Sequence, residues 1–229
     1  MQNNETIENV VELEKPSLIG LIMNPSEQFE RIRKNPKIIV ALIVVTIMTI
    51  VAALLSLQGM DEILEQEMVG VSEEELMIFT IATQITTVVM ATFTPAIIIL
   101  ISSGIYMLIA KIVQSDVTFK QMFSLFVYVS FITALGGLIN GFFSMFVTGS
   151  NPNIPLTSLN SIVGAEGVLG VIFSTIEVFS IWGLVLTAIG LQIVAKFSKG
   201  LAWGTVIAFF IITLGFAIGA TMLGEALGV

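Results

Sequence analysis

One carboxylate, Glu177, lies in the middle of a long apolar run and is the residue best placed to do chemistry inside a membrane. An ionisable side chain is costly in hydrocarbon, and such residues commonly mark proton or ion pathways. No Lys or Arg lies at the same depth, so we expect Glu177 to be protonated or to hydrogen-bond to polar groups such as Asn140 and Gln84 on facing helices. Two interpretations stay open: a site that handles a proton or cation, and a structural hydrogen bond between helices.

A second group of acidic side chains lies between two apolar runs. This stretch contains no base and seven acids, namely Asp61, Glu62, Glu65, Glu67, Glu73, Glu74 and Glu75. Met60, Ile63, Leu64 and Met68 are spaced for one apolar face, which predicts a short amphipathic helix. We interpret the acids as a docking patch for a basic partner, as loose divalent-cation ligands, or as a solvated cap. Their spacing does not match a helix–loop–helix calcium site.

Most other chemistry is excluded by residue type. The chain has no Cys and no His, so thiolate nucleophiles, imidazole bases and the usual zinc ligands are missing. It has no phosphate-binding glycine loop and no nucleophile elbow. With a net charge of −8, it also has no basic surface to neutralise nucleic-acid phosphates. We therefore expect no enzyme activity, no catalytic residue, no cofactor, no metal site and no nucleic-acid partner.

The composition indicates the solvent in which these residues must work. Only 11% of residues are charged, whereas a soluble domain carries roughly a quarter. Too few polar side chains remain to cover a globule of 229 residues. The composition therefore predicts an all-α protein that crosses a membrane several times.

Five apolar runs reach the length of about 20 residues that a spanning helix needs. They divide residues 38–229, the expected membrane domain, into spans at about 38–57, 77–113, 121–147, 167–195 and 201–223. The second run is longer than one crossing requires, but no polar loop divides it. We therefore predict one long helix, kinked near Pro95.

The basic residues set the expected orientation. With five spans, all nine lie on one side of the membrane: Lys15, Arg31, Arg33, Lys34, Lys37, Lys111, Lys120, Lys196 and Lys199. Lys and Arg in short loops favour the cytoplasm, so the N-terminus is expected inside and the C-terminus outside. Six spans would place some of these lysines outside. The sequence thus predicts a five-span protein of the bacterial plasma membrane.

The N-terminal region is expected to have two parts. Residues 1–16 are acidic and polar, and we expect a disordered cytoplasmic tail. Residues 17–37 have helical apolar spacing, broken where Asn24 can cap a second helix that begins at Pro25. Such amphipathic helices lie on a membrane face, or they pack under the bundle; both alternatives stay open. In the first case the contacts to acidic lipid headgroups would be Arg31, Arg33, Lys34 and Lys37.

Two small-residue motifs lie in the apolar runs. Gly137-x-x-x-Gly141 and Gly215-x-x-x-Gly219 each allow two helices to approach closely. Such motifs serve packing within a bundle or form a homo-oligomer interface, and the sequence leaves both readings open.

Three segments carry a resemblance to a known family. They are residues 17–37 (SLIGLIMNPSEQFERIRKNPK), 118–139 (TFKQMFSLFVYVSFITALGGLI) and 178–199 (VFSIWGLVLTAIGLQIVAKFSK). Together they resemble the bacterial branch of the YIP family of small multi-span membrane proteins. Eukaryotic relatives bind small GTPases, but this chain lacks their longer, aspartate-rich N-terminal region, so a GTPase partner is not expected.

The resemblance implies a function that residue spacing does not. It implies a five-span fold and an accessory role beside an ABC-type exporter, which comprises an ATPase/permease and a membrane-fusion-like subunit, in protection against a toxic secreted peptide. The alternative is an independent transporter or channel. That function would need a polar path, which the residues around Glu177 would have to supply.

Overall fold

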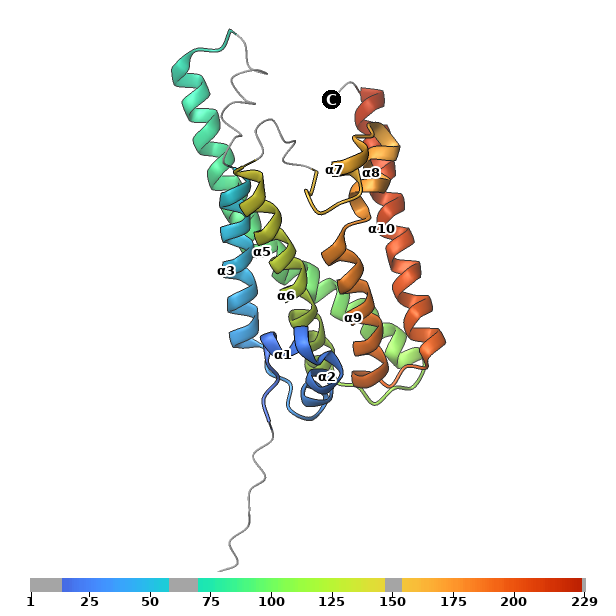
Figure 1. Ribbon diagram of the computed structural model, residues 1–229. Helices are drawn as coiled ribbons and strands as arrows, with labels where there is room; N and C mark the ends of the chain where they lie inside the picture. The colour runs from blue at the N-terminus through green and yellow to red at the C-terminus, as the bar shows by residue number, and fades with distance from the viewer. Residues whose placement is uncertain (1–13, 58–69, 147–153, 228–229) are drawn as a thin grey trace, which may run out of the picture.

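The computed structural model describes residues 14–57, 70–146 and 154–227, and these fold into α-helices joined by short links (Figure 1). Within these ranges there is no β-strand, only an isolated bridge between Ser158 and Glu177. The helices are α1 (Leu18–Met23), α2 (Pro25–Lys34), α3 (Ile39–Ser56), α5 (Glu73–Ile112), α6 (Phe119–Ser144), α7 (Asn160–Val163), α8 (Gly167–Thr175), α9 (Val178–Val194) and α10 (Lys199–Leu227).

Four helices of the described structure, α3, α5, α6 and α10, are long and apolar enough to cross a membrane, and α9 is a shorter apolar helix. Both ends of each of these four helices lie within four residues of the ends of the span predicted from the sequence. The prediction that 77–113 forms one helix is confirmed, because α5 runs through Pro95 without interruption. Thr118 caps α6 through reciprocal hydrogen bonds with Gln121.

Helix α6 is the centre of the bundle. More than half of its spanning window is buried, and α3, α5 and α9 all pack against it. The ring of Tyr106 in α5 contacts both Phe126 in α6 and Phe209 in α10, with ring centroids 5.0 and 4.9 Å apart. Figure 1 shows α5 crossing behind α3 and α6, from the end where α3 finishes to the start of α10. The outer faces of α5 and α10 stay apolar and exposed, as lipid contact requires.

The two ends of the bundle differ. The proximal end carries α1, α2, the α5–α6 link and the α9–α10 link, whereas the C-terminus of α10 lies at the opposite, distal end (Figure 1). A hydrogen bond joins the two proximal links directly: Ser115 Oγ in the α5–α6 link donates to the carbonyl of Ala195 in the α9–α10 link at 2.6 Å. The structure thus gathers at one end the segments whose basic residues the sequence placed on one side.

Two short helices close the proximal end. Asn24 caps α2 and Pro25 is its first residue, which confirms the predicted division of residues 17–37. Leu21, Phe29 and Ile32 are fully buried, since α2 packs against α9 and α6. Of the two alternatives for this segment, the structure therefore shows packing under the bundle.

The predicted fourth span, 167–195, needs a correction. It is not one continuous helix, because α8 ends at Thr175 and α9 begins at Val178. The carbonyl of Ile176 accepts a hydrogen bond from Leu159 N at 2.9 Å, where a continuous helix would use Ser180 N. A loop residue thus takes the place of the helical donor, and the chain breaks at Glu177.

Some predicted features lie outside the described residues. These are most of the acidic tail at 1–16, the amphipathic helix expected around 60–68, and the four acids Asp61, Glu62, Glu65 and Glu67.

The glycines of α6 pack inside the bundle. A Cβ atom at Gly141 would lie 3.0 Å from the carbonyl oxygen of Ala52, and one at Gly136 would lie 2.6 Å from Cβ of Phe179. At Gly215 and Gly219 of α10 nothing described lies within 4 Å of such an atom. The first motif therefore serves intramolecular packing, while the second faces outward.

This packing yields a stability prediction. Gly136→Ala should lower the Tm of the purified protein in detergent, because the added methyl overlaps Phe179; overpacking of this kind costs about 1–3 kcal/mol. Gly137→Ala is the matched control, since its Cβ would lie 3.4 Å from Cβ of Ala52, an ordinary contact. Tryptophan fluorescence during heating measures both. Equal Tm values for the two variants would contradict the α6–α9 packing.

Candidate functional site

Glu177 stands at the break between α8 and α9, with its residue surface 6% exposed. It is the N-cap of α9: Oε2 accepts a hydrogen bond from Ser180 N at 2.6 Å. Such a cap satisfies a backbone donor that a helix start leaves unpaired. The sequence expectation of a carboxylate partway along a helix is therefore wrong in its local geometry, although the residue is buried as expected.

Thr157 connects Glu177 to α6. Its hydroxyl lies 2.6 Å from Oε1 of Glu177 and 3.0 Å from Oδ1 of Asn140, and its backbone N donates to the same Asn140 oxygen at 2.9 Å. Asn140 Nδ2 in turn donates to the carbonyl of Gly136 at 2.9 Å. Glu177 and Asn140, which were predicted to hydrogen-bond, are thus joined only indirectly, through Thr157 of the loop.

The loop before α8 folds back toward α6 and the start of α9, where Thr157 reaches Asn140 and Glu177. The bridge between Ser158 and Glu177 places their side chains on one side of a short extended pair. Asn160 fixes the next turn, because its side chain bonds to both the N and the O of Ala165. The hydroxyl of Ser158 is buried and has no hydrogen-bond partner among the described residues.

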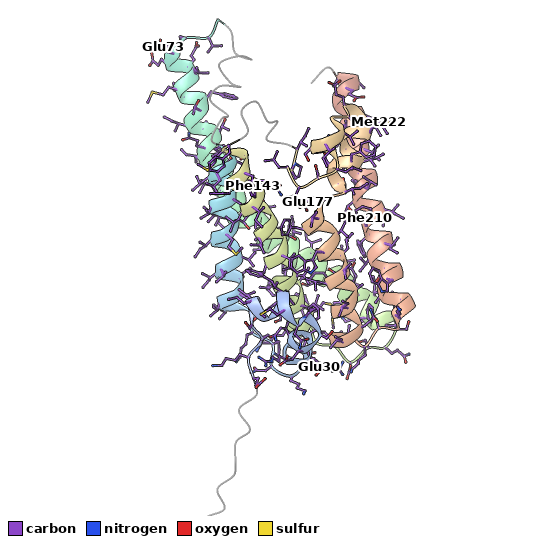
Figure 2. The ribbon with its side chains drawn as sticks, viewed as in Figure 1. Glu30, Glu73, Phe143, Glu177, Phe210 and Met222 are labelled. Atoms are coloured by element: carbon purple, nitrogen blue, oxygen red, sulfur yellow. The ribbon has the colours of Figure 1, made fainter. Side chains whose placement is uncertain are left out.

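Helix lengths place this junction close to the distal boundary of the hydrocarbon. The 17 residues of α9 rise about 25 Å, against about 30 Å for the hydrocarbon core. Figure 2 shows Glu177 between the two ends that Glu30 and Glu73 mark. Irregular backbone at this depth is tolerated where protein groups satisfy it, and here Leu159 N serves the carbonyl of Ile176 while the Glu177 carboxylate serves Ser180 N.

The chemistry of the junction is that of a hydrogen-bonded clasp. Both oxygens of Glu177 accept bonds from donors on the protein, and each donor belongs to a different segment. Among residues 14–57, 70–146 and 154–227, no group of three or more acids gathers in a way that could hold a metal ion. The geometry accounts for the position of Glu177 without a transported ion.

The other predicted site residues lie elsewhere. Gln84 is exposed on α5, and no hydrogen bond of the described structure joins it to Glu177. Glu73, Glu74 and Glu75 form the first turn of α5, where acids favour a helix start. Hydrogen bonds from Ser72 lower the pKa of Glu75, which lies outside the expected span.

The four candidate lipid contacts divide into two pairs. Arg31 forms ion pairs with Glu27 and Glu14, and Arg33 with Asp116 at 3.2 Å. Arg33 also donates to the carbonyls of Ile193 and Val194, so it satisfies the C-terminal end of α9. Lys34 and Lys37 are exposed, with no ion pair among the described residues.

Sequence reasoning missed Thr157 and Ser158, which lie in a loop that turn residues identify only as a connection. A local signal for the break does exist: Glu177 follows the β-branched pair Thr175 and Ile176. A carboxylate in that position can cap a helix start, as Glu177 does by accepting from Ser180 N. That signal is weak inside an apolar run, because its partner Thr157 is distant in sequence.

The fold defines an all-helical, multi-pass protein of the cell membrane. Comparison with known proteins then gives the family: the chain belongs to the Yip1 domain family, whose model matches residues 19–221. It is 36% identical over 231 residues to Membrane protein YknW of Bacillus subtilis (strain 168), with both chains covered in full. No solved structure matches the chain significantly. The resemblance seen in the sequence is therefore confirmed.

The clasp yields a prediction that separates its two donors. Glu177→Gln should keep the Tm, because the amide oxygen can accept from Ser180 N while its NH₂ donates to Thr157. Glu177→Leu should lower the free energy of unfolding by about 1 kcal/mol through loss of the cap. Thr157→Val, which removes only the bridging hydroxyl, should lower it by a similar amount.

Thermal melts of the three proteins in one detergent provide the measurement. A Glu177→Leu protein as stable as the unmodified chain would show that the clasp does not hold the break.

Proposed function

We propose that this chain is a non-enzymatic accessory subunit that helps assemble or stabilise an ABC-type exporter in the cell membrane. The kind of partner comes from the family resemblance, which also links the role to protection against a toxic secreted peptide. The observation that carries the accessory role is the distal arm of α5, residues 73–90, which contains no buried residue in the described structure.

The length of α5 supports a protein partner for this arm. Its 40 residues rise about 60 Å, and even at a 40° tilt only roughly 26 of them lie within the hydrocarbon. Lys111 in the last turn places that stretch at the proximal end, so residues 73–86 extend beyond the hydrocarbon on the distal side. Yet Met77, Ile78 and Ile85 are each at least 60% exposed there. Large exposed apolar surfaces outside lipid mark interaction sites.

We also propose the topology that the basic residues predict: five spans, the proximal end in the cytoplasm and the C-terminus outside. Arg33 and Asp116 form an ion pair, and Ser115 bonds to Ala195, so the N-terminal helices and both proximal links lie on one side. Every described Lys and Arg belongs to these segments or to the turns beside them. Positive charge on one side favours its cytoplasmic placement.

A second candidate function, an independent transporter or channel, rests on the break at Glu177. Discontinuous helices build substrate sites in many transporters. Here, however, the groups at the break bond to one another, and the donors come from the protein itself. If Glu177 carries a proton or cation, Glu177→Gln should abolish cellular protection while the Tm is unchanged; full protection would remove this candidate.

The topology is tested with reporter fusions. A reporter that is active only outside the cell should work when fused after Val229. A reporter that is active only inside the cell should work when inserted between Ser198 and Lys199. The same location for both sites would overturn the five-span proposal.

The accessory role is tested by co-purification in a mild detergent. Tagged protein should recover an ABC-type ATPase/permease, and the triple variant Met77→Gln, Ile78→Gln, Ile81→Gln should recover at least tenfold less, because the apolar face of the arm is lost. The matched control is Ile162→Gln with Val163→Gln, which changes exposed apolar residues of α7 and should recover the same amount as the unmodified chain. Failure of the unmodified protein to recover any transporter subunit would count against the proposal.

A further inference from the structure

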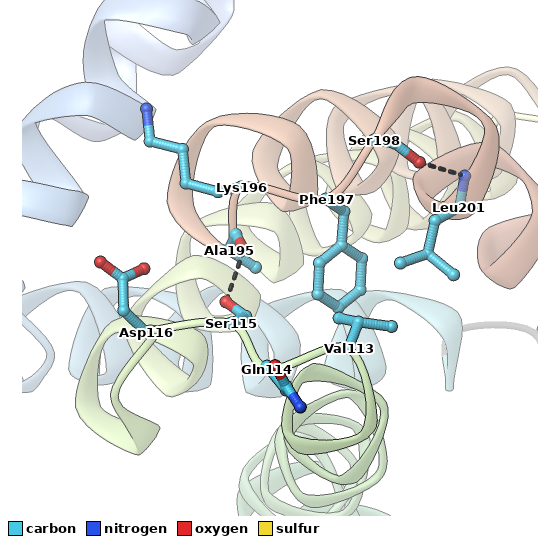
Figure 3. A pocket seen from close by; sticks show the side chains of 9 residues that line it. All are labelled: Val113, Gln114, Ser115, Asp116, Ala195, Lys196, Phe197, Ser198 and Leu201. Atoms are coloured by element: carbon cyan, nitrogen blue, oxygen red, sulfur yellow. Dashed lines mark hydrogen bonds between the residues drawn. The ribbon is translucent and has the colours of Figure 1, made fainter.

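A pocket of about 460 Å³ lies at the proximal end, between the last turn of α5 and the first turn of α10 (Figure 3). Two links form it: residues 113–116, which lead from α5 to α6, and residues 195–198, which lead from α9 to α10. The bond from Ser115 Oγ to the carbonyl of Ala195 holds the links together. Lys196 has a left-handed backbone, φ 57°, and ends the turn after α9.

The pocket has an apolar side and a charged side. Figure 3 shows Val113, Phe197 and Leu201 on one side, and Lys196 with Asp116 on the other. The apolar side continues onto the lipid-facing surface of α5, where Ile112 is 81% and Val113 42% exposed. An amphiphile whose tail lies against α5 could therefore place its polar end in the pocket.

The charge available to that polar end is positive. Lys196 lines the pocket, and Lys199 directly follows Ser198, which also lines it. Neither lysine side chain has a hydrogen bond or ion pair within the described part of the chain. The carboxylate of Asp116 is already paired with Arg33 at 3.2 Å, which offsets its repulsion of an anion. Helix α10 starts at this point, so the positive end of its dipole adds to the lysine charges.

We propose that this pocket binds the headgroup of a single anionic phospholipid, with the phosphate beside Lys196 and Lys199 and one acyl chain against Val113 and Leu201. Basic pockets between membrane helices on the cytoplasmic side are suited to such headgroups. The volume lies within the range of small-molecule sites. A bound lipid would join the α5–α6 and α9–α10 links and so stabilise the proximal end.

The test is native mass spectrometry of the delipidated full-length protein titrated with dioleoylphosphatidylglycerol. The unmodified chain should bind one molecule more tightly than all later ones. Lys196→Gln with Lys199→Gln should weaken that first binding about 25-fold, since each lysine contributes about fivefold near an anionic surface. Lys34→Gln with Lys37→Gln is the control, because it removes the same charge from exposed lysines of the same end.

The remaining arms separate a site from general attraction. Dioleoylphosphatidylcholine should bind without a preferred first molecule, and 10-fold excess inorganic phosphate should not displace phosphatidylglycerol, because it lacks the acyl chain. Equal weakening by the two double variants, or equally tight binding of phosphatidylcholine, would overturn the proposal. Displacement by inorganic phosphate would overturn the lipid assignment in favour of a free-anion site.

Discussion

The structure depends on the requirement that backbone polar groups in hydrocarbon be satisfied by the protein itself. The fourth apolar segment meets this requirement without a continuous helix, since α8 ends at Thr175 and α9 begins at Val178. Leu159 N then serves the carbonyl of Ile176, and Glu177 serves the amide of Ser180. The loop before α8 must return to this depth to supply these partners, and Thr157 anchors it to Asn140 of α6.

The same rule explains the proximal end. Helix α9 ends at Val194, and Arg33 supplies donors to its last carbonyls while pairing with Asp116. Burial of Phe29 and Ile32 holds α2 in position for that contact. The N-terminal helices therefore cover the proximal end of the membrane domain. Helix α9 is capped by protein groups at both ends, by Glu177 at its start and by Arg33 at its end. A helix held in this way suits a scaffold better than a moving gate.

Sequence reasoning succeeded where the signal is local and continuous. The length of an apolar run specifies α3 and α6, and the pair Asn24-Pro25 specifies where α2 begins. It failed where distant residues compete with the helix. Thr157 and Glu177 are 20 positions apart, and nothing in the run from 167 to 195 shows that a loop will replace a helical hydrogen bond. The pairing of Arg33 with Asp116, 83 positions away, is hidden for the same reason.

Three features support the proposed scaffold role: the central helix α6, the capped helix α9 and the exposed arm of α5. If Glu177 is a structural clasp, the protein alone should not move ions. The most direct measurement is proton and sodium flux into liposomes that contain only this protein, with protein-free liposomes as the reference. We expect the two rates to be equal. A protein-dependent flux that Glu177→Gln abolishes would contradict the account and make the break in the fourth segment a transport site.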